Sequence, residues 1–410
     1  MSEDLTFDPQ LPELPLALDR GAVAQLFATR WPAGEPPETV RSCRLRDVKY
    51  QPGRRCVASY ELEVERGGAP ARTIGVVELT PDGLAHRLYD DDPRLPWLAE
   101  AADVRRMAPR FAALLGEVVL SCSVTPVRYR AGARCVFRYE LSTPSRAVTI
   151  FGKLLEPGAA ELAATVDALH RASVESPAMP HVPPPLAYWP ELRMVLQPEV
   201  AGRAELNDLA FSQDVELATR ERWLRDAGLR LAGLHALQQV PAPPRTLDED
   251  LAELREYLAP MAAADPALAR RYEAAVDQVA AAVRDLPEPP RVASHGAFRT
   301  DQFLIQDDRL VLIDLDGFCW ANPARDIGNF LAYLRWKAIR QPQRAGLIEQ
   351  AGERFLEGYE AARPGVDARW LAICRAMSML KIAGRRYRSL TVKEWPLVPA
   401  LLDAAQLALQ

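Results

Sequence analysis

Lysine is scarce in this chain of 410 residues, because only five of its 50 basic residues are lysines and the others are arginines. A GC-rich genome, which favours arginine codons, explains this bias without any functional cause. The lysines are Lys49, Lys153, Lys337, Lys381 and Lys393. An excess of positive charge is also absent, since the net charge is −5. Nucleic acid and anionic membranes require a basic surface, so we expect neither to be the main partner.

Three further absences concern the membrane, secretion and metals. The sequence has no run of about 18 apolar residues, which argues against a membrane-spanning helix. Its first residues, MSEDLTFDPQ, lack the basic and apolar regions of a secretory signal. The six cysteines form no CxxC pair and no cluster with histidine, so no zinc site is predicted. We therefore expect a cytoplasmic protein with reduced thiols.

The chain contains an internal repeat in its first half. Residues 42–62 (SCRLRDVKYQPGRRCVASYEL) align without gaps on residues 121–141 (SCSVTPVRYRAGARCVFRYEL), and 11 of the 21 positions are identical. Each copy alternates apolar and polar residues around a turn, at Gly53 in the first copy and at Gly132 in the second. This pattern predicts two β-hairpins of the same design.

The repeat also contains two cysteines per copy. A fold at the turn places the two cysteines of the first copy opposite other residues: Cys43 opposite Glu61 or Leu62, and Cys56 opposite Val48 or Lys49. The cysteines of one hairpin thus do not face each other. We expect them to pack as small hydrophobic residues within the strands.

The rest of the chain changes from β-like to helical patterns. Each hairpin leads into a further β-like run, at residues 72–79 and 147–155, and helical periodicity dominates from residue 216 onward. Only residues 291–315 interrupt the helices with short strand-like pieces. The length predicts two or three domains, which we place at residues 1–110 (a cap), 111–198 (a β-rich lobe) and 199–410 (a helical lobe).

Two motifs in the second half carry a family resemblance. Residues 310–334 (LVLIDLDGFCWANPARDIGNFLAYL) are similar to a pattern of apolar strand, aspartate and Pro-x-x-Asp-Ile-Gly. Residues 295–302 (HGAFRTDQ) are similar to HGDxxxxN or HGDxxxxQ. Both patterns belong to the aminoglycoside phosphotransferase and choline kinase family, and the chain most resembles its capped bacterial sugar kinases of the maltokinase type.

The resemblance implies an α+β, protein-kinase-like fold with two lobes. A β-rich N-lobe would be followed by a helical C-lobe, and the N-terminal β-rich cap would be related to the N-lobe. The implied cofactors are ATP, or GTP, and Mg²⁺, and the implied partner is a small-molecule acceptor. The sequence does not indicate an oligomeric state.

Phosphoryl transfer needs side chains that hold phosphates and Mg²⁺, and the motifs supply candidates. Lys153 follows a strand and is implied to neutralise the α- and β-phosphates, with Glu161 on the next helix as its ion-pair partner. Asp314 ends an apolar strand, a place that packing alone explains poorly, and its carboxylate suits Mg²⁺. Gln302 occupies the position of the family's Asn or Gln and is implied to be a second metal ligand.

Other positions receive roles from the resemblance alone. The turn at Gly132 either covers phosphates or is an ordinary hairpin. The backbone at Glu199 and Val200 lies where the family's lobe linker meets adenine. His295 is implied to brace the loop of residues 295–302, and Asp326 to cap a nearby turn.

The family's catalytic aspartate is missing, because its position holds Ala297. Asp301 or Asp316 could replace it as the base, although an extended loop would point Asp301 away from Gln302. Asp316 would point to the same side as Asp314 in an extended chain. Alternatively the reaction needs no base, since loose phosphoryl transfer gains little from early proton removal. Arg299, in place of a common histidine, could instead bind a different acceptor or the phosphate.

Three functional interpretations follow. The first is a phosphotransferase that acts on a sugar or amino-alcohol with an atypical catalytic loop. The alternative is a pseudokinase, which binds a nucleotide or metabolite and performs no chemistry. The third is a transferase that moves a different group from ATP. Two basic clusters, at residues 334–340 and 381–390, either line an acceptor cleft or are solvated helix faces.

Overall fold

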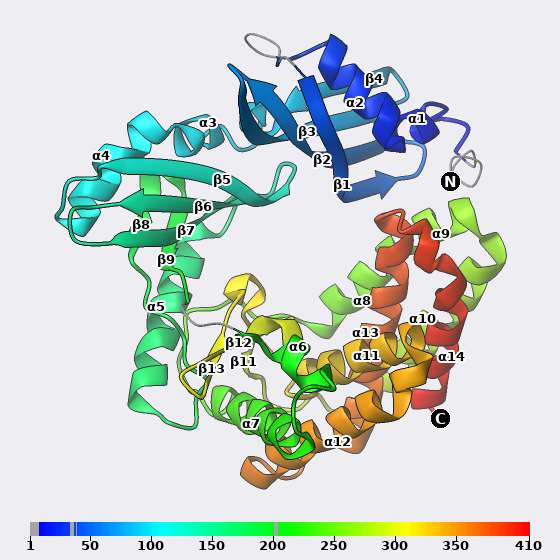
Figure 1. Ribbon diagram of the computed structural model, residues 1–410. Coiled ribbons are helices and arrows are strands. Elements are labelled where there is room, and N and C mark those ends of the chain that lie inside the picture. The colour runs from blue at the N-terminus through cyan, green and yellow to red at the C-terminus, as the bar shows by residue number, and fades with distance from the viewer. Residues whose placement is uncertain (1–7, 33–36, 38, 201–203) are drawn as a thin grey trace. The chain divides into compact units, whose positions relative to one another are not determined.

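The structure is a computed structural model that describes residues 8–32, 37, 39–200 and 204–410, without the side chain of Arg66. The chain forms two compact units (Figure 1). The first unit contains Met1–Ala163, Pro185–Glu199 and Arg388–Leu390, and the second contains Ala164–Pro184, Val200–Tyr387 and Thr391–Gln410. Each unit is described by itself.

The first unit is built on two antiparallel sheets, each preceded by a pair of helices. The first copy comprises α1 (Leu14–Leu18), α2 (Arg20–Thr29), β1 (Thr39–Gln51), β2 (Arg55–Arg66), β3 (Ala69–Thr80) and β4 (Gly83–Leu88). The second comprises α3 (Leu98–Ala102), α4 (Val104–Leu115), β5 (Ser121–Arg130), β6 (Arg134–Ser142), β7 (Ala147–Leu155), β8 (Ala187–Trp189) and β9 (Met194–Pro198). The strand orders are β1-β2-β3-β4 and β5-β6-β7-β9-β8. The repeat in the sequence is thus a repeat of two helices and three strands.

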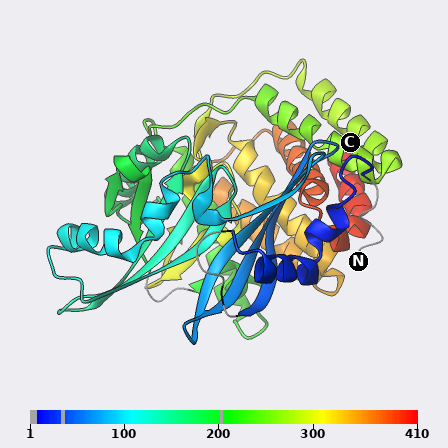
Figure 2. The same cartoon turned by 90° about the horizontal axis from the view of Figure 1, so that it is seen from above.

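The helices of each copy pack on one face of their own sheet (Figures 1 and 2). In the first copy the hydroxyl of Tyr60, on β2, donates to the carbonyl of Ala17, on α1. In the second copy Tyr139, on β6, donates in the same way to Ala101, on α3. The opposite face of the first sheet contributes Val57 to a core that includes residues of the second sheet. The two copies therefore share a hydrophobic core, as expected for a cap related to the N-lobe.

An aspartate before each helix pair holds the turn of each hairpin. Asp8 accepts hydrogen bonds from the Tyr50 hydroxyl, at 2.8 Å, and from the Gly53 N–H, at 2.9 Å. Gly53 adopts φ +64°, the left-handed region that suits glycine. The carboxylate therefore fixes the end of β1 and the turn together.

Asp92 makes the equivalent bonds in the second copy. Its carboxylate accepts from the Tyr129 hydroxyl and from the Gly132 N–H, both at 2.6 Å. The two aspartates begin related segments, DPQLP at residues 8–12 and DPRLP at residues 92–96. The structure thereby shows that the repeat includes these two segments, which are too short to be recognised as a repeat from the sequence alone.

Replacing Asp92 by alanine is expected to lower the free energy of unfolding by about 3 kcal/mol. The change leaves two buried donors without partners, and each such loss costs about 1–3 kcal/mol. The urea midpoint of the purified variant measures the effect. Asp91→Ala is the matched control, because this neighbouring aspartate is exposed. Equal midpoints for the two variants would contradict the proposed role of the carboxylate.

The strand register confirms one predicted cysteine position and corrects the other. Cys43 lies opposite Leu62, as expected, but Cys56 lies opposite Tyr50. The pairing of Gln51 with Arg55 centres the turn on Gly53, and this places Cys56 opposite Tyr50. The register shift between Leu45 and Asp47 lies farther along β1 and affects the partner of Cys43 only. All six cysteines are free thiols.

The boundaries proposed from the sequence coincide only partly with the observed elements. Residue 110, the expected end of the cap, lies inside α4, whose Phe111 packs on Tyr139 with ring centroids 4.8 Å apart. The helix pair α3 and α4 thus packs on the second sheet. Residue 198, the expected end of the N-lobe, is also the last residue of β9.

The second unit is mainly helical, with two small sheets. It contains most of α5 (Ala159–Glu175), then β10 (Ala204–Glu205), α6 (Leu206–Phe211), α7 (Leu217–His235), α8 (Leu247–Glu256), α9 (Leu258–Ala264), α10 (Pro266–Val283), β11 (Val292–Ser294), β12 (Phe303–Gln306), β13 (Arg309–Leu312), β14 (Cys319–Ala321), α11 (Ala324–Arg340), α12 (Ala345–Ala362), α13 (Ala368–Arg388) and α14 (Val398–Ala408). The sheets have the orders β10-β12-β13 and β11-β14. Strands β11, β12 and β13 lie within residues 291–315, where the sequence predicted an interruption of the helices, whereas β10 and β14 lie outside that range.

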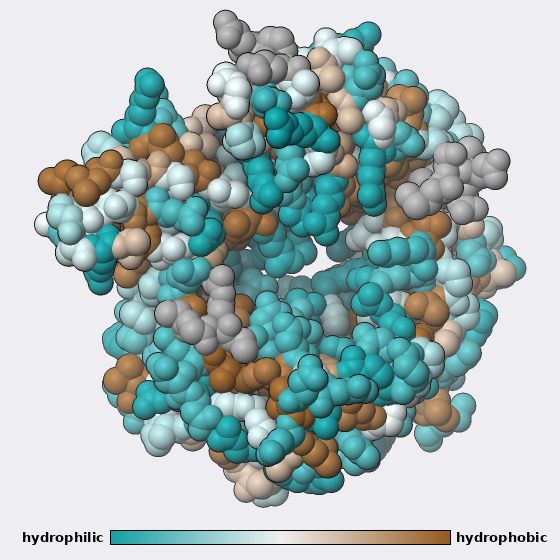
Figure 3. Space-filling model, in the orientation of Figure 1, coloured by the Kyte–Doolittle hydropathy of each residue, from teal (hydrophilic) through white to brown (hydrophobic). Residues whose placement is uncertain are grey.

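Two glycines allow helices of the second unit to pack closely. Gly228 on α7 and Gly358 on α12 lie where a Cβ atom on either would overlap the backbone of the other helix. Residues on the outer helix faces are largely hydrophilic, as Figure 3 shows for the face drawn there. Among the described residues, no helix combines the length and the apolar character needed to cross a membrane.

Candidate active site

The loop between β11 and β12 is anchored by the buried carboxylate of Asp326, on the first turn of α11. Asp326 has no exposed surface, and it accepts from the backbone N–H groups of His295, at 2.6 Å, and of Gly296, at 2.9 Å. Gly296 has φ +78°, and a Cβ there would overlap the carbonyl of Gly317. The loop therefore requires this glycine. The turn-capping role expected for Asp326 is confirmed by these two bonds.

The imidazole of His295 connects this loop to the end of β13. Its Nε2 lies 3.0 Å from the carbonyl oxygen of Ile313, the residue before Asp314. Ile313 in turn donates its N–H to the carbonyl of Gln302, at 3.0 Å. The loop, Gln302 and the residue before Asp314 are thus held together by hydrogen bonds, and the bracing role expected for His295 is confirmed.

Asp314 lies in a backbone conformation that is unusual for a residue with a side chain. Its φ and ψ are +61° and +53°, the left-handed region. Such a conformation costs free energy, and residues held in it are enriched at functional sites. Asp314 lies two residues after the end of β13 and immediately before the 3₁₀ turn η5 (Leu315–Gly317).

Gln302 presents a buried oxygen that the described residues leave without a hydrogen bond. Gln302 is only 4% exposed, and its side-chain Nε2 donates a hydrogen bond to the Asp301 carboxylate at 3.1 Å. Oε1 has no hydrogen-bond partner among the described residues. A buried acceptor without a partner is costly, so its occupation by a ligand would be favourable.

The amide oxygen of Gln302 and the carboxylate of Asp314 fit a hard cation such as Mg²⁺. This ion takes one or two carboxylates, keeps several waters and completes its shell with substrate phosphates. The described part of the chain has no group of three or more His, Cys, Asp or Glu residues suited to a metal. Such a group is not required for a cation that phosphates help to bind.

The structure corrects the geometry expected for Asp301. Residues Thr300–Gln302 form a 3₁₀ turn, η4, so the argument from an extended loop does not apply. Asp301 contacts the amide of Gln302 instead of facing away, and its carboxylate lies 2.8 Å from Nε of Arg299. Arg299 also lies over the ring of Tyr333, 4.8 Å from its centroid. Asp301 is thus part of a local ion pair, and we do not assign the missing base to it.

Asp316 is likewise not placed as an extended chain would place it. It lies within η5, where the backbone turns immediately after Asp314. The chain is therefore not extended here, so the expectation that Asp314 and Asp316 point to the same side of a strand does not apply. A second metal-ligand or catalytic role for Asp316 stays a prediction.

The lysine predicted to bind phosphate lies on a central strand of the second sheet. Lys153, on β7, pairs with Val136 on β6 and with Val195 on β9. The residue at the equivalent register of the first copy is Glu78, which pairs with Val57. The first copy thus has an acid where the second has the lysine.

The remaining predicted positions have clear structural surroundings. Glu161 lies in the first turn of α5. The Gly132 N–H donates to Asp92, which favours an ordinary hairpin over a phosphate cover. The Glu199 N–H donates to Thr149, and Val200 is buried in a small cluster with Leu304 and Val311. Lys153, Glu161 and Gly132 belong to the first unit and Gln302 and Asp314 to the second. Their convergence on one nucleotide stays a prediction.

A polar cavity beside the loop was not predicted as a site. It has a volume of about 790 Å³ and is lined by residues of α6, the segment after it, Lys337 of α11 and the segment that follows α11. Lys337 donates to the Asn207 side chain at 2.8 Å, and Asn207 also accepts from Thr300 of the loop, at 3.1 Å. Burial lowers the pKa of Lys337 to about 8, and the charge of Arg344 acts in the same direction. The basic cluster at residues 334–340 was the only signal in the sequence.

The second basic cluster, at residues 381–390, forms ion pairs within the helical unit. Lys381 donates to Glu253 at 2.6 Å, and Arg385 lies 3.5 Å from the same carboxylate. Although burial opposes the shift, the Lys381 charge and hydrogen bond lower the pKa of Glu253 to about 2. These side chains are therefore engaged in ion pairs between helices.

The comparisons with known proteins agree with this arrangement. A model of the phosphotransferase enzyme family matches residues 136–364, more than half of the chain. The chain belongs to this family. No curated protein matched the sequence of this phosphotransferase-family member.

Several solved structures of kinases and phosphotransferases have a similar fold. An amicoumacin kinase in complex with AMP-PNP, Ca²⁺ and its substrate has a TM-score of 0.52 and 14% identity, covering 75% of this chain and 95% of its own. A structure described as a putative aminoglycoside phosphotransferase from Ralstonia eutropha has a TM-score of 0.51 and 15% identity, covering 74% and 98%. A glucosamine kinase covers 94% of this chain and 97% of its own, at 17% identity and a TM-score of 0.44. The likeness to the first two of these structures shows the protein-kinase-like α+β fold that was predicted from the sequence.

Proposed function

We propose that this chain binds ATP with Mg²⁺ and transfers a phosphoryl group to a hydroxyl of a small molecule of the sugar or amino-alcohol class. The observation that carries the proposal is the buried amide oxygen of Gln302, which has no hydrogen bond among the described residues, on a residue whose backbone carbonyl accepts from Ile313, the neighbour of Asp314. The His295 ring bonds to the Ile313 carbonyl, and the Asp326 carboxylate accepts from the His295 N–H, so hydrogen bonds hold both segments in place. Preorganised oxygen ligands are what catalysis by positioning and electrostatics requires.

Each side of the reaction has candidate residues. Gln302 and Asp314 would hold Mg²⁺, which neutralises charge on the phosphates when bound. Lys153, with Glu161 as its ion-pair partner, would bind the α- and β-phosphates, and the backbone at residues 199–200 would meet the adenine. The cavity of about 790 Å³ is the candidate acceptor site.

The lining of that cavity supports a hydroxyl-rich acceptor. It presents the amide of Asn207, the carboxylates of Asp208 and Asp214, and the cations of Lys337 and Arg344. Donors and acceptors of both charges suit the hydroxyl and amino groups of a sugar or amino-alcohol. An apolar acceptor would leave these polar groups without partners.

Ala297 favours the alternative of a pseudokinase that binds nucleotide and performs no chemistry. The alanine side chain cannot accept a proton, and general-base catalysis contributes about 10²–10⁴-fold where it operates. In a loose transition state, however, the acceptor proton leaves late, so transfer can proceed slowly without a base. This argument favours a slow enzyme over an inactive one.

The two candidates differ in one measurement. Under our proposal, Mg-ATP raises the thermal unfolding temperature, and ADP release depends on the acceptor in a panel of sugars and amino-alcohols. Saturable stabilisation by Mg-ATP with no turnover across the panel would support the pseudokinase. No stabilisation by ATP or GTP would contradict both functions.

A further inference from the structure

The cavity of about 790 Å³ in the second unit contains two cations from neighbouring segments of the chain. Lys337 belongs to α11, and Arg344 follows that helix at the end of the 3₁₀ turn η6 (Pro342–Arg344). Both residues are half-buried. Burial lowers the pKa of Lys337, and among the nearby charges that of Arg344 has the largest effect and lowers it further. The two cations are thus close enough to repel each other.

Lys337 is held in place but retains donors that no described group uses. Its ammonium donates to Asn207 Oδ1 at 2.8 Å and lies 3.7 Å from the centroid of the Phe211 ring. An ammonium has three N–H donors, and the bond to Asn207 is the only one that it makes among the described residues. The charged group is therefore positioned in advance for a ligand oxygen.

Arg344 also has donors without acceptors. A guanidinium has five N–H donors, and one of them meets the Gln341 amide oxygen at the long distance of 3.4 Å. Its Nε is buried and has no partner among the described residues. Within the described part of the chain, neither Arg344 nor Lys337 forms an ion pair with a carboxylate. An anion that contacts both side chains would relieve their repulsion.

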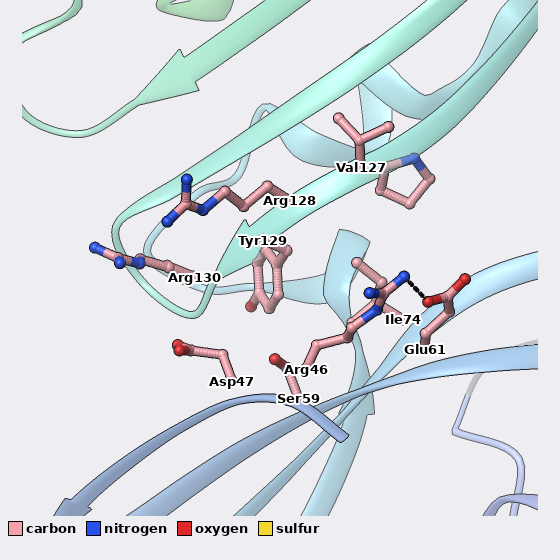
Figure 4. Close-up of a pocket in the computed structure, with 10 residues that line it drawn as sticks. Arg46, Asp47, Ser59, Glu61, Ile74, Val127, Arg128, Tyr129 and Arg130 are labelled. Carbon is pink, nitrogen blue, oxygen red and sulfur yellow. Dashed lines mark ion pairs between the residues drawn. The ribbon is translucent and has the colours of Figure 1, made fainter. Parts of the chain in front are cut away.

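A smaller polar pocket in the first unit lacks this feature. It has a volume of about 220 Å³ and lies beside Ser59, between the first sheet and β5 (Figure 4). Its Arg46 pairs with Glu61, as the dashed line in Figure 4 shows. The protein itself thus neutralises positive charge in this pocket, which it does not do for Lys337 and Arg344.

The other residues of the large cavity narrow the class of anion. Most of them carry amide or hydroxyl groups, which suit the hydroxyls of a sugar: Asn207, Ser212, Gln213, Gln341 and Gln343. Two exposed carboxylates, Asp208 and Asp214, match the two cations in number. They would repel a doubly charged phosphate more strongly than a singly charged carboxylate. The lining therefore favours a monoanion with several hydroxyl groups.

Asn207 connects the two cations to the loop of residues 295–302. Its side-chain oxygen accepts from the Lys337 ammonium and also from the Thr300 hydroxyl, at 3.1 Å. Thr300 lies two residues before Gln302, the proposed metal ligand. An acceptor anchored at Lys337 would thus lie beside the loop that carries this ligand.

We propose that the acceptor is a sugar acid whose carboxylate binds to Lys337 and Arg344. This inference rests on the proposed phosphotransferase function and specifies its substrate class. In the reaction, a hydroxyl oxygen of the sugar acid forms a bond to the γ-phosphorus of ATP, and the bond from that phosphorus to the β,γ-bridging oxygen breaks. ADP leaves, and the hydroxyl proton passes to water. Lys337 and Arg344 act only in binding.

Calorimetric titration of the full-length protein without nucleotide tests the anion site separately from catalysis. D-gluconate should bind saturably at millimolar concentration and about tenfold more tightly than D-glucitol, which has a CH₂OH group in place of the carboxylate. Lys337→Gln and Arg344→Gln should each weaken D-gluconate binding about tenfold, because each removes a charged donor. Lys393→Gln is the matched control at an exposed lysine outside the cavity, and it should bind D-gluconate as the wild type does.

Several results of the titration would overturn the inference. These are D-gluconate binding no tighter than that of D-glucitol, unchanged affinity in both cavity variants, and an equal loss in Lys393→Gln. Tighter binding of D-glucitol 6-phosphate than of D-gluconate would identify the anion as a phosphate and overturn the sugar-acid assignment. The thermal midpoint of each variant without ligand separates a lost site from a lost fold, and the wild-type comparison of the two sugars does not depend on any variant.

The ADP-release assay gives a second readout, which also tests the proposed function. In the wild type, kcat/KM for D-gluconate should exceed that for D-glucitol about tenfold, and this ratio should fall toward one in both cavity variants. Turnover with neutral sugars or amino-alcohols but not with D-gluconate would overturn the inference and leave the proposed function standing. Selective D-gluconate binding without turnover of any acceptor would support the anion site and contradict the phosphotransferase function.

Discussion

Replacing Asp314 by asparagine is expected to reduce acceptor-dependent ADP release about 10³-fold. Loss of one preorganised electrostatic group at a reacting centre typically costs about 10²–10³ in rate, and here the lost group is also a charged metal ligand. Asparagine is chosen because, unlike alanine, it tolerates the left-handed conformation observed at this position. The rate change therefore reports on charge and not on backbone strain.

The control for this experiment lies in the same hairpin. Asp307 also has a positive φ, +47°, but is exposed in the turn between β12 and β13. Asp307→Asn makes the same charge change at the other end of the two strands and should retain wild-type turnover. Turnover of Asp314→Asn that equals that of the control would remove the proposed metal-ligand role, as would an unchanged requirement for Mg²⁺.

Introducing an aspartate at position 297 is expected to raise turnover about 10²-fold, the lower end of the usual contribution of a general base. The loop that would present the new carboxylate is already anchored by the two N–H groups that donate to Asp326 and by the His295 ring. The remaining elements of the site need not be rebuilt. Initial rates of ADP release at saturating Mg-ATP and acceptor measure the gain.

The matched variant is Ala297→Asn, which has the same size but no base. Equal turnover in the aspartate and asparagine variants would mean that proton removal does not limit the reaction. If the aspartate variant binds Mg-ATP as the wild type does and still shows no turnover with any acceptor, the result would favour the pseudokinase interpretation over the phosphotransferase interpretation.

Local features were predicted well where they depended on neighbours in the sequence. The hairpins followed from alternating residues around Gly53 and Gly132, and the helical second half followed from its periodicity. The family motifs indicated the position of Asp314 at the end of β13. The predicted geometry failed where it assumed extended backbone, at Asp301 and Asp316, because both lie in 3₁₀ turns.

The features that the sequence did not reveal depend on residues far apart in the chain. Asp8 and Asp92 act on turns about 40 residues downstream, and Asn207 joins Thr300 to Lys337. The pocket at Ser59 exists only because β5 packs across the first sheet.

The amino-acid sequence by itself determined the repeated hairpins, the family and the alanine at position 297, where the family resemblance implies an aspartate, since each depends on residue identity and short spacing. The tertiary structure alone decided which polar groups meet: the Asp326 carboxylate with the loop, the Gln302 backbone with the residue before Asp314, and the cap with β5. Hydrogen bonds and burial act between groups close in space, and only the folded chain brings these groups together.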